Sequence, residues 1–228
     1  MPTPSSEARS PQAPQMRRQP KQARSQERVE QILNAAEALF IEVGYEQTTT
    51  RAIATRAQVP VGSLYQFFPD KEAILKSLAD RYLQQEYELF ASLHVNMPES
   101  MPLAAYVDRM VAAFDHFMTH QPGYCAVFEQ VLGLMTAGAI AELDTYQAQI
   151  VEDLAAFLGR LKPELAGDQR RAIALVVVES VGNLLWLSLK ADPPLRVTLI
   201  AETKRLMTTY LSSYLGDVVA LQTNLQTP

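Results

Sequence analysis

Two short segments of the sequence carry side chains that could bind a polyanion and read a pattern of hydrogen-bond donors and acceptors. The first opens with three threonines, Thr48 to Thr50, whose hydroxyls can cap a helix. Free backbone N–H groups at such an N-terminus bind phosphate, so Thr49 and Thr50 are candidate phosphate contacts. The alternative is that Thr49 serves only as a cap.

The second segment, Val61–Phe67, is about two helical turns long and could lie in the major groove of DNA. Leu64 and Phe68, four residues apart, would anchor its inner side. The residues left for the groove or its rim are Val61, Gly62, Ser63, Tyr65, Gln66 and Phe67. Gln66 could pair with an adenine edge, Val61 could contact a thymine methyl group, and Tyr65 could reach a phosphate. Tyr65 could equally be a half-buried aromatic residue of a small domain.

Four helices must position these segments. Apolar residues at three- and four-residue spacing predict a helix from Ser25 to Val43, with Gly44 as its stop. The threonines open a second helix that ends near Gln58, and Pro60 suits the first turn of the third. Asp70 can cap a fourth helix that reaches about Leu93. Two short helices gripped between two longer ones form a helix-turn-helix unit.

The rest of the chain repeats the helical pattern and shows no alternation typical of a β-strand. Breakers such as Gln121-Pro122-Gly123 separate five further helices. They are expected at 103–120, 124–135, 140–161, 168–190 and 195–214. The sequence therefore predicts an all-α fold of about nine helices, in which the fourth joins an N-terminal three-helix domain to a larger helical domain.

The segment TTTRAIATRAQVPVGSLYQFFPDKEAI, residues 48–74, together with LNAAEALFIEVGYE upstream, resembles the DNA-binding domain of the TetR/AcrR family of bacterial transcriptional regulators. The resemblance covers roughly residues 25–80 and implies an all-helical dimer with a ligand-binding and dimerisation domain behind the DNA-binding one. It also implies that Arg51 reaches a base or a phosphate and that Lys71 clamps the DNA backbone, although Lys71 could be merely a solvated first-turn residue. The sequence departs from the family at Gln58, where a glycine is usual, and at Pro60, where a serine cap is frequent.

Charge and composition divide the chain into parts with different expected partners. The net charge is −5, yet Lys and Arg outnumber Asp and Glu by 11 to 9 up to Arg81 and are outnumbered by 16 to 9 beyond it. We expect a proline-rich basic arm over 1–22, which could be a nucleic-acid arm or a solubilising tail. A DNA-binding domain over 23–80, a ligand-binding and dimerisation domain over 81–217 and a tail over 218–228 follow.

The second domain offers adaptable and aromatic side chains that could line a cavity for a small molecule. For each of them, packing in a filled core is the alternative. The candidates for ligand binding are Met110, Phe114, Phe117, Met118, Tyr124, Phe128, Met135, Tyr146, Glu179, Asn183 and Trp186.

Glu179 and Asn183 lie four residues apart in a helix that is otherwise apolar from Ala172 to Leu189. We interpret this stretch as a buried helix rather than a membrane span, because the two polar residues interrupt it and no other such span accompanies it. A buried carboxylate needs a partner, so Glu179 is expected to face a ligand, a dimer interface or an arginine.

No arrangement of residues suggests catalysis. The sequence has no glycine-rich phosphate loop, nucleophile elbow or pair of carboxylates suited to acid-base work. The single cysteine, Cys125, excludes an internal disulfide framework, and His116 and His120 have metal-ligand spacing without a third ligand. We expect no enzyme activity, no metal and no cofactor.

The resemblance implies a ligand-responsive regulator, usually a repressor, that binds a palindromic operator as a homodimer, and the apolar candidates for ligand binding imply release by a partly apolar small molecule. The last two helices carry enough apolar surface for the dimer interface, with Val177 and Leu211 among the contacts. The chain lacks a secretory signal and is expected in the cytoplasm. The alternatives are a helical enzyme or carrier domain fused to a degenerate DNA-binding fold, and a regulator controlled by a protein partner.

Overall fold

The computed structural model describes residues 23–95, 97, 100–134, 145–216 and 218–220, and within them the chain forms nine helices and two short strands. The expected basic arm over 1–22 and the candidate ligand residue Met135 lie outside these residues. The elements are α1 (Ala23–Val43), α2 (Thr50–Arg56), α3 (Val61–Phe67), α4 (Lys71–Val95), β1 (Ser100–Pro102), α5 (Leu103–His120), α6 (Tyr124–Leu134), α8 (Thr145–Leu161), α9 (Gly167–Leu189), α10 (Pro193–Leu215) and β2 (Val218–Ala220).

The predicted all-α fold is confirmed, with one local exception. Strands β1 and β2 pair antiparallel, with Met101 opposite Val219. Three residues per strand are too few to display an alternating pattern, which is why the sequence gave no sign of them.

The chain divides into two compact units. Of the described residues, the first unit contains 23–79 and 126–134, and the second contains those from 80 to 125 and from 145 onward. Helix α4 therefore belongs to the first unit up to Ala79 and to the second from Asp80.

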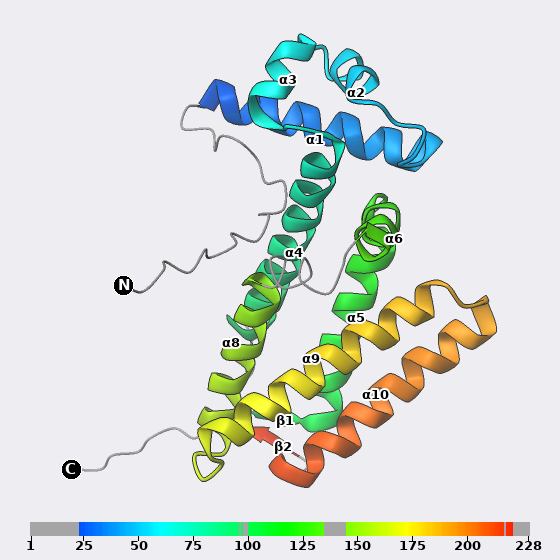
Figure 1. Cartoon of the computed structure of the whole chain (residues 1–228). Coiled ribbons are helices and arrows are strands. Elements are labelled where there is room, and N and C mark those ends of the chain that lie inside the picture. Colours follow the sequence, from blue (N-terminus) through cyan, green and yellow to red (C-terminus); the bar gives the residue numbers. More distant parts are fainter. Residues whose placement is uncertain (1–22, 96, 98–99, 135–144, 217, 221–228) are drawn as a thin grey trace, which may run out of the picture. The chain divides into compact units, whose positions relative to one another are not determined.

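The core of the first unit is built from the apolar faces of α1, α2, α3 and the start of α4 (Figure 1). Ile32, Ile53, Leu64 and Ile74 contribute one fully buried side chain from each helix. Gly44 ends α1 with a φ of +82°, in the left-handed region that glycine tolerates best. The helical periodicity predicted these inward faces correctly.

In the second unit α9 packs between α8 and α10, and α10 also contacts α5. Figure 1 shows α9 and α10 running side by side in opposite directions. Helix α10 begins at Pro193, two residues before the expected start at 195, and Asp192 accepts a hydrogen bond from Leu195 N at 3.0 Å. Proline suits this first turn because its missing N–H would have no helical partner there.

The expectation that α9 is a buried helix is wrong for the single chain. Among the described residues α9 is the one helix long and apolar enough to cross a membrane, but only 22% of its most apolar stretch is buried. Leu175, Val176 and Leu187 are exposed to solvent. The apolar surface of α9 is therefore larger than the area that α8, α10 and the rest of the same chain cover.

Candidate nucleic-acid interface and effector cluster

The three threonines before α2 have three different roles. Thr49 is the N-cap and accepts a hydrogen bond from Ala52 N at 3.1 Å. Thr48 is buried and donates to the Gly44 carbonyl at 2.8 Å, while Thr50 lies 2.9 Å from the Tyr65 hydroxyl. In the cap the Thr49 hydroxyl oxygen only accepts a hydrogen bond, so the hydroxyl hydrogen of this exposed side chain can still be donated to a phosphate oxygen.

An ion pair that the sequence pattern did not single out fixes α2 against α1. The Arg56 guanidinium forms a two-pronged contact with the Glu42 carboxylate, at 2.5 and 2.6 Å. The hydrogen bond from Arg56 holds the pKa of Glu42 below its ordinary value. Both residues are exposed, so the pair orients the helix more than it stabilises the fold.

The turn between α2 and α3 places Gln58 in the left-handed region, with a φ of +56°. This is the position where the resembled family usually has glycine, and a side chain there costs about 1 to 2 kcal/mol. Pro60 is the N-cap of α3, one residue earlier than expected, and provides no side-chain cap. The chain therefore makes this turn with local strain that glycine would relieve.

Helix α3 has a buried inner side and an exposed outer side. Leu64 and Phe68 are fully buried, as predicted for the anchors. Phe67 is also buried, at 5% exposure, so its expected position at the groove was wrong. Phe67 follows Leu64 by three residues and therefore shares its helical face.

The outer side of α3 carries the other candidate readers. Gly62, Tyr65 and Gln66 are exposed, and Val61 and Ser63 are partly exposed. A Cβ atom built on Gly62 would have no heavy atom of the chain within 4 Å outside its own helical backbone and chain neighbours. Packing within the chain therefore gives no reason for a glycine here.

Lys71 contacts the protein itself. Its ammonium group donates to the Tyr45 carbonyl at 2.6 Å and to the Glu46 carbonyl at 3.4 Å, and it lies 4.0 Å from the centre of the Tyr45 ring. These contacts join the start of α4 to the loop after α1. An ammonium group has three donors, so one remains for a phosphate. Arg51 is exposed on the first turn of α2.

The ligand candidates separate into a cluster and several scattered residues. The rings of Phe117 and Trp186 lie 6.0 and 6.3 Å from the ring of Tyr124. The Tyr146 ring instead lies 6.2 Å from that of Tyr87. Met118 is buried in α5, and three further candidates are partly exposed: Met110, Phe114 and Phe128.

Glu86 of α4 is a member of the cluster that the sequence interpretation missed. The Tyr124 hydroxyl donates to Glu86 Oε1 at 2.8 Å. Burial raises the pKa of the Glu86 carboxyl to about 7, and the hydrogen bond from Tyr124 opposes this shift. Glu86 follows Tyr82 by four residues and precedes Phe90 by four, and both are buried. This four-residue spacing from two buried aromatic residues is the signal that could have identified Glu86.

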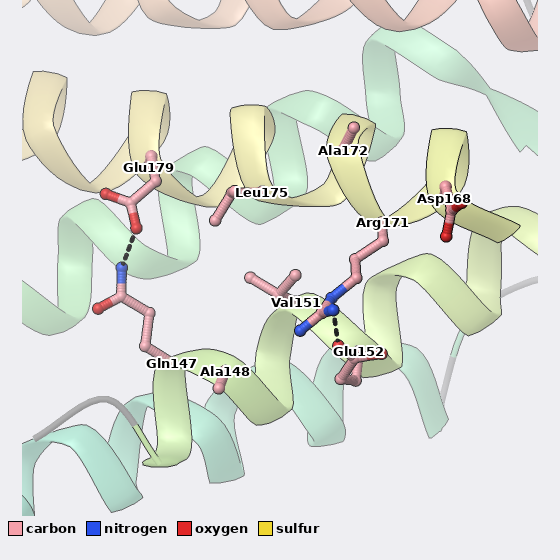
Figure 2. Close-up of a pocket in the computed structure, with 9 residues that line it drawn as sticks. All are labelled: Gln147, Ala148, Val151, Glu152, Asp168, Arg171, Ala172, Leu175 and Glu179. Carbon is pink, nitrogen blue, oxygen red and sulfur yellow. Dashed lines mark hydrogen bonds and ion pairs between the residues drawn. The ribbon is translucent and has the colours of Figure 1, made fainter. Parts of the chain in front are cut away.

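The structure contradicts the expectation that Glu179 and Asn183 are buried. Both are exposed, and Asn183 donates to the Glu179 carbonyl at 2.8 Å. Glu179 also accepts a hydrogen bond from Gln147 Nε2 at 2.8 Å. An open groove of about 420 Å³ lies between α8 and α9. Figure 2 shows Glu179 toward one end of the row of lining residues and the Arg171–Glu152 ion pair toward the other.

His116 and His120 stack with ring centres 3.8 Å apart, and His120 Nδ1 lies 2.9 Å from the His116 carbonyl oxygen. Within the described part of the chain no group of three or more His, Cys, Asp or Glu side chains is placed to hold a metal ion.

Two family models match the chain. Residues 32–78 match "Bacterial regulatory proteins, tetR family", and residues 102–211 match "Tetracyclin repressor-like, C-terminal domain". The two matches agree with the layout that the resemblance implied.

Several curated proteins are similar in sequence. The HTH-type transcriptional repressor BepR of Brucella suis is 33% identical over 72% of this chain and 83% of its own length. The repressor KstR of Rhodococcus jostii is 34% identical over 52% of this chain, and that of Mycobacterium tuberculosis is 28% identical over 73%. The chain spans about half the length of the Rhodococcus protein and 74% of the mycobacterial one.

Solved structures show the same fold. A TetR-family regulator from Streptomyces coelicolor is 26% identical and aligns with a TM-score of 0.58 over 82% of this chain and 99% of its own. Another from Mesorhizobium loti, 17% identical, aligns with a TM-score of 0.65 over 84% and 98%.

Proposed function

Because the chain belongs to the TetR family of bacterial transcriptional regulators, we propose that it represses transcription by binding a palindromic operator as a homodimer in the cytoplasm. Helix α3 carries this proposal, since its inner side is locked by Leu64 and Phe68 while its outer side is polar and open. A recognition helix needs this combination of a rigid anchor and free donors and acceptors. The relatives described above are named as transcriptional regulators, which favours this function over the enzyme alternative.

We assign the contacts by chemistry. Gln66 and Val61 face base edges, and Gly62 and Ser63 allow the helix to come close to the groove. Thr49, Thr50, Arg51, Tyr65 and Lys71 contact phosphates, with Arg51 also within reach of a base. The hydrogen bond between the Thr50 and Tyr65 hydroxyls joins α2 to α3 and so fixes the relative positions of two helices that contact phosphates.

The dimer interface lies on α9 and α10. Leu187 and Leu206 are exposed at 53% and 50%, and Val197 at 69%. Each large apolar side chain left in water costs about 1.5 to 3 kcal/mol, so a second copy that covers these faces is strongly favoured. Leu211, expected among the contacts, is buried within its own chain, and Val177 is only partly exposed.

Release from the operator comes from a partly apolar small molecule bound in the second unit. Its binding favours a dimer geometry in which the two recognition helices no longer match successive major grooves. This requires unequal affinity for the two geometries, with a coupling of about 1 to 3 kcal/mol.

The DNA-binding part of the proposal is tested by the salt dependence of operator affinity. An operator is first selected from random duplexes, and its affinity is then measured by fluorescence anisotropy at several salt concentrations. Each phosphate contact contributes about 0.9 to the slope of log affinity against log salt. Lys71→Met keeps an unbranched side chain and removes the charge, so the slope should fall by about one unit.

The control is Lys162→Met, which removes the same charge from the other unit, where Lys162 pairs with Glu164 at 3.3 Å. It should leave the slope unchanged. Selection of no duplex by the wild-type protein would contradict the proposed function. An unchanged slope in Lys71→Met would remove Lys71 alone from the contacts.

A further inference from the structure

Glu86 is an acidic side chain set among aromatic rings in the second unit. Its carboxylate accepts a hydrogen bond from the Tyr124 hydroxyl at 2.8 Å. The Tyr124 ring is surrounded by the rings of Tyr82, Phe117 and Trp186, whose centres lie 5.6, 6.0 and 6.3 Å away. The Tyr82 and Phe117 rings present their edges in T-shaped contacts.

Some side chains of this cluster are buried, and others are partly exposed to solvent. Tyr82 and Tyr124 are buried, whereas Glu86, Phe117 and Trp186 remain partly accessible to solvent. A ligand can therefore contact Phe117 and Trp186 without displacing the buried Tyr82 and Tyr124.

The carboxylate is poorly compensated within the chain. A carboxylate can accept about four hydrogen bonds, and Tyr124 supplies one to Glu86. No cationic side chain of the described residues lowers its pKa, which burial raises to about 7. A carboxylate in this environment is costly unless a positive group joins it. A neutral glutamine in place of Glu86 would accept the same hydrogen bond from Tyr124, so this bond alone does not require a carboxylate.

Two of the rings that contact Tyr124 already have positive groups of the protein near their centres. Lys190 Nζ lies 4.7 Å from the centre of the Trp186 ring, and Arg81 Cζ lies 5.9 Å from that of Tyr82. An aromatic face binds a cation through its negative electrostatic potential, and a carboxylate beside it adds a full opposite charge. The combination suits an organic cation with an apolar body.

We propose that Glu86 binds the positively charged group of an organic-cation effector whose apolar body packs against Phe117 and Trp186. This inference rests on the proposed function, because it names the chemical class of the molecule that releases the operator. It assigns Glu86 the role of recognising charge and Tyr124 the role of orienting the carboxylate.

The experiment measures binding without DNA, so that its outcome is independent of repression. Trp186 is the single tryptophan of the chain and lies at the site, so its fluorescence reports occupancy. Three probes share a twelve-carbon chain and differ in head-group charge: dodecyltrimethylammonium, dodecanol and dodecanoate, each titrated below its micelle concentration. The variants are Glu86→Gln and Tyr124→Phe, with Glu88→Gln as a control, since Glu88 is exposed on the same helix.

We expect the wild-type protein to bind the cation more tightly than the alcohol or the carboxylate. Glu86→Gln should weaken cation binding by about tenfold or more and leave alcohol binding unchanged, because it removes only the charge. Glu88→Gln should behave as wild type. Equal affinity of wild type and Glu86→Gln for the cation, or a wild-type preference for dodecanoate, would overturn the proposal even if the operator is bound normally. A protein that binds the cation selectively but selects no operator would instead refute the proposed function.

Discussion

Replacing Gly62 with alanine should make the protein more stable and a weaker DNA binder at the same time. Gly62 is the second residue of α3, it is exposed, and its φ is not in the left-handed region. A Cβ atom there would meet nothing within 4 Å. The folded chain alone therefore tolerates alanine, and alanine restricts the unfolded chain more than glycine does.

The two effects can be given magnitudes. Alanine is favoured over glycine within a helix by about 0.5 to 1 kcal/mol, which corresponds to a rise in Tm of about 1 to 4 °C for a chain of this size. If the backbone at Gly62 approaches the groove, the added methyl group displaces α3 outward. The loss of one good base contact costs about 1 to 3 kcal/mol, or on the order of tenfold or more in operator affinity.

Thermal unfolding followed by circular dichroism and anisotropy titration of the operator measure the two effects separately. Gly167→Ala is the matched control, because Gly167 also lies in the first turn of a helix, in the second unit, and its added Cβ would meet only the end of the flexible Arg170 side chain, at 3.9 Å. The control should gain stability and keep its operator affinity, with sedimentation confirming the dimer. A stabilised Gly62→Ala protein with wild-type affinity would refute the close approach of α3 to DNA, and a destabilised one would refute the open space around Gly62.

Three further predictions concern the dimer, the buried carboxylate and the strained turn. Leu187→Glu combined with Leu206→Glu should sediment as a folded monomer, and a persistent dimer would place the interface elsewhere. Because the folded-state pKa of Glu86 is raised, its protonated form stabilises the protein at low pH, and this contribution is lost as pH rises through about 7. Glu86→Gln should therefore exceed wild type by up to about 3 kcal/mol in unfolding free energy at pH 8, with the difference vanishing toward pH 4.5 in urea titrations. Gln58→Gly should raise the unfolding free energy by up to about 1 kcal/mol, and a loss of stability would mean that the turn is not strained.

The sequence predicted the framework of the candidate interface well because its helices are short, amphipathic and clearly punctuated. Gly44, Thr49 and Asp70 mark helix ends, and all three act there in the structure. Phe67 was misplaced because two turns of helix have room for a second inward residue three positions from Leu64, and apolar spacing alone does not limit the number of anchors.

Glu86 was missed for a different reason. An acidic residue in a long helix is usually part of the polar surface, so residue type gave no reason to place Glu86 inside. Tyr82 and Phe90, four residues before and after Glu86, are buried, and the Tyr124 hydroxyl contacts the Glu86 carboxylate. Phase, rather than residue type, was the useful signal, and it points to a polar group that a ligand can recognise.

The opposite error at Glu179 has the same origin as the expectation of a dimer. A helix that is apolar on nearly every side indicates that its sides are covered, but the pattern does not tell whether the cover is the same chain or another copy. In the single chain, α8 and α10 cover two sides of α9, and Leu175, Val176 and Leu187 remain in water. Glu179 lies on the open groove side and is satisfied by Gln147, so it needs no buried partner. The apolar excess that made Glu179 look buried is thus the surface that a second copy would cover. Glu179→Gln should accordingly leave folding near wild type, because the Glu179 carboxylate is exposed and its Gln147 hydrogen bond can also be made by an amide oxygen.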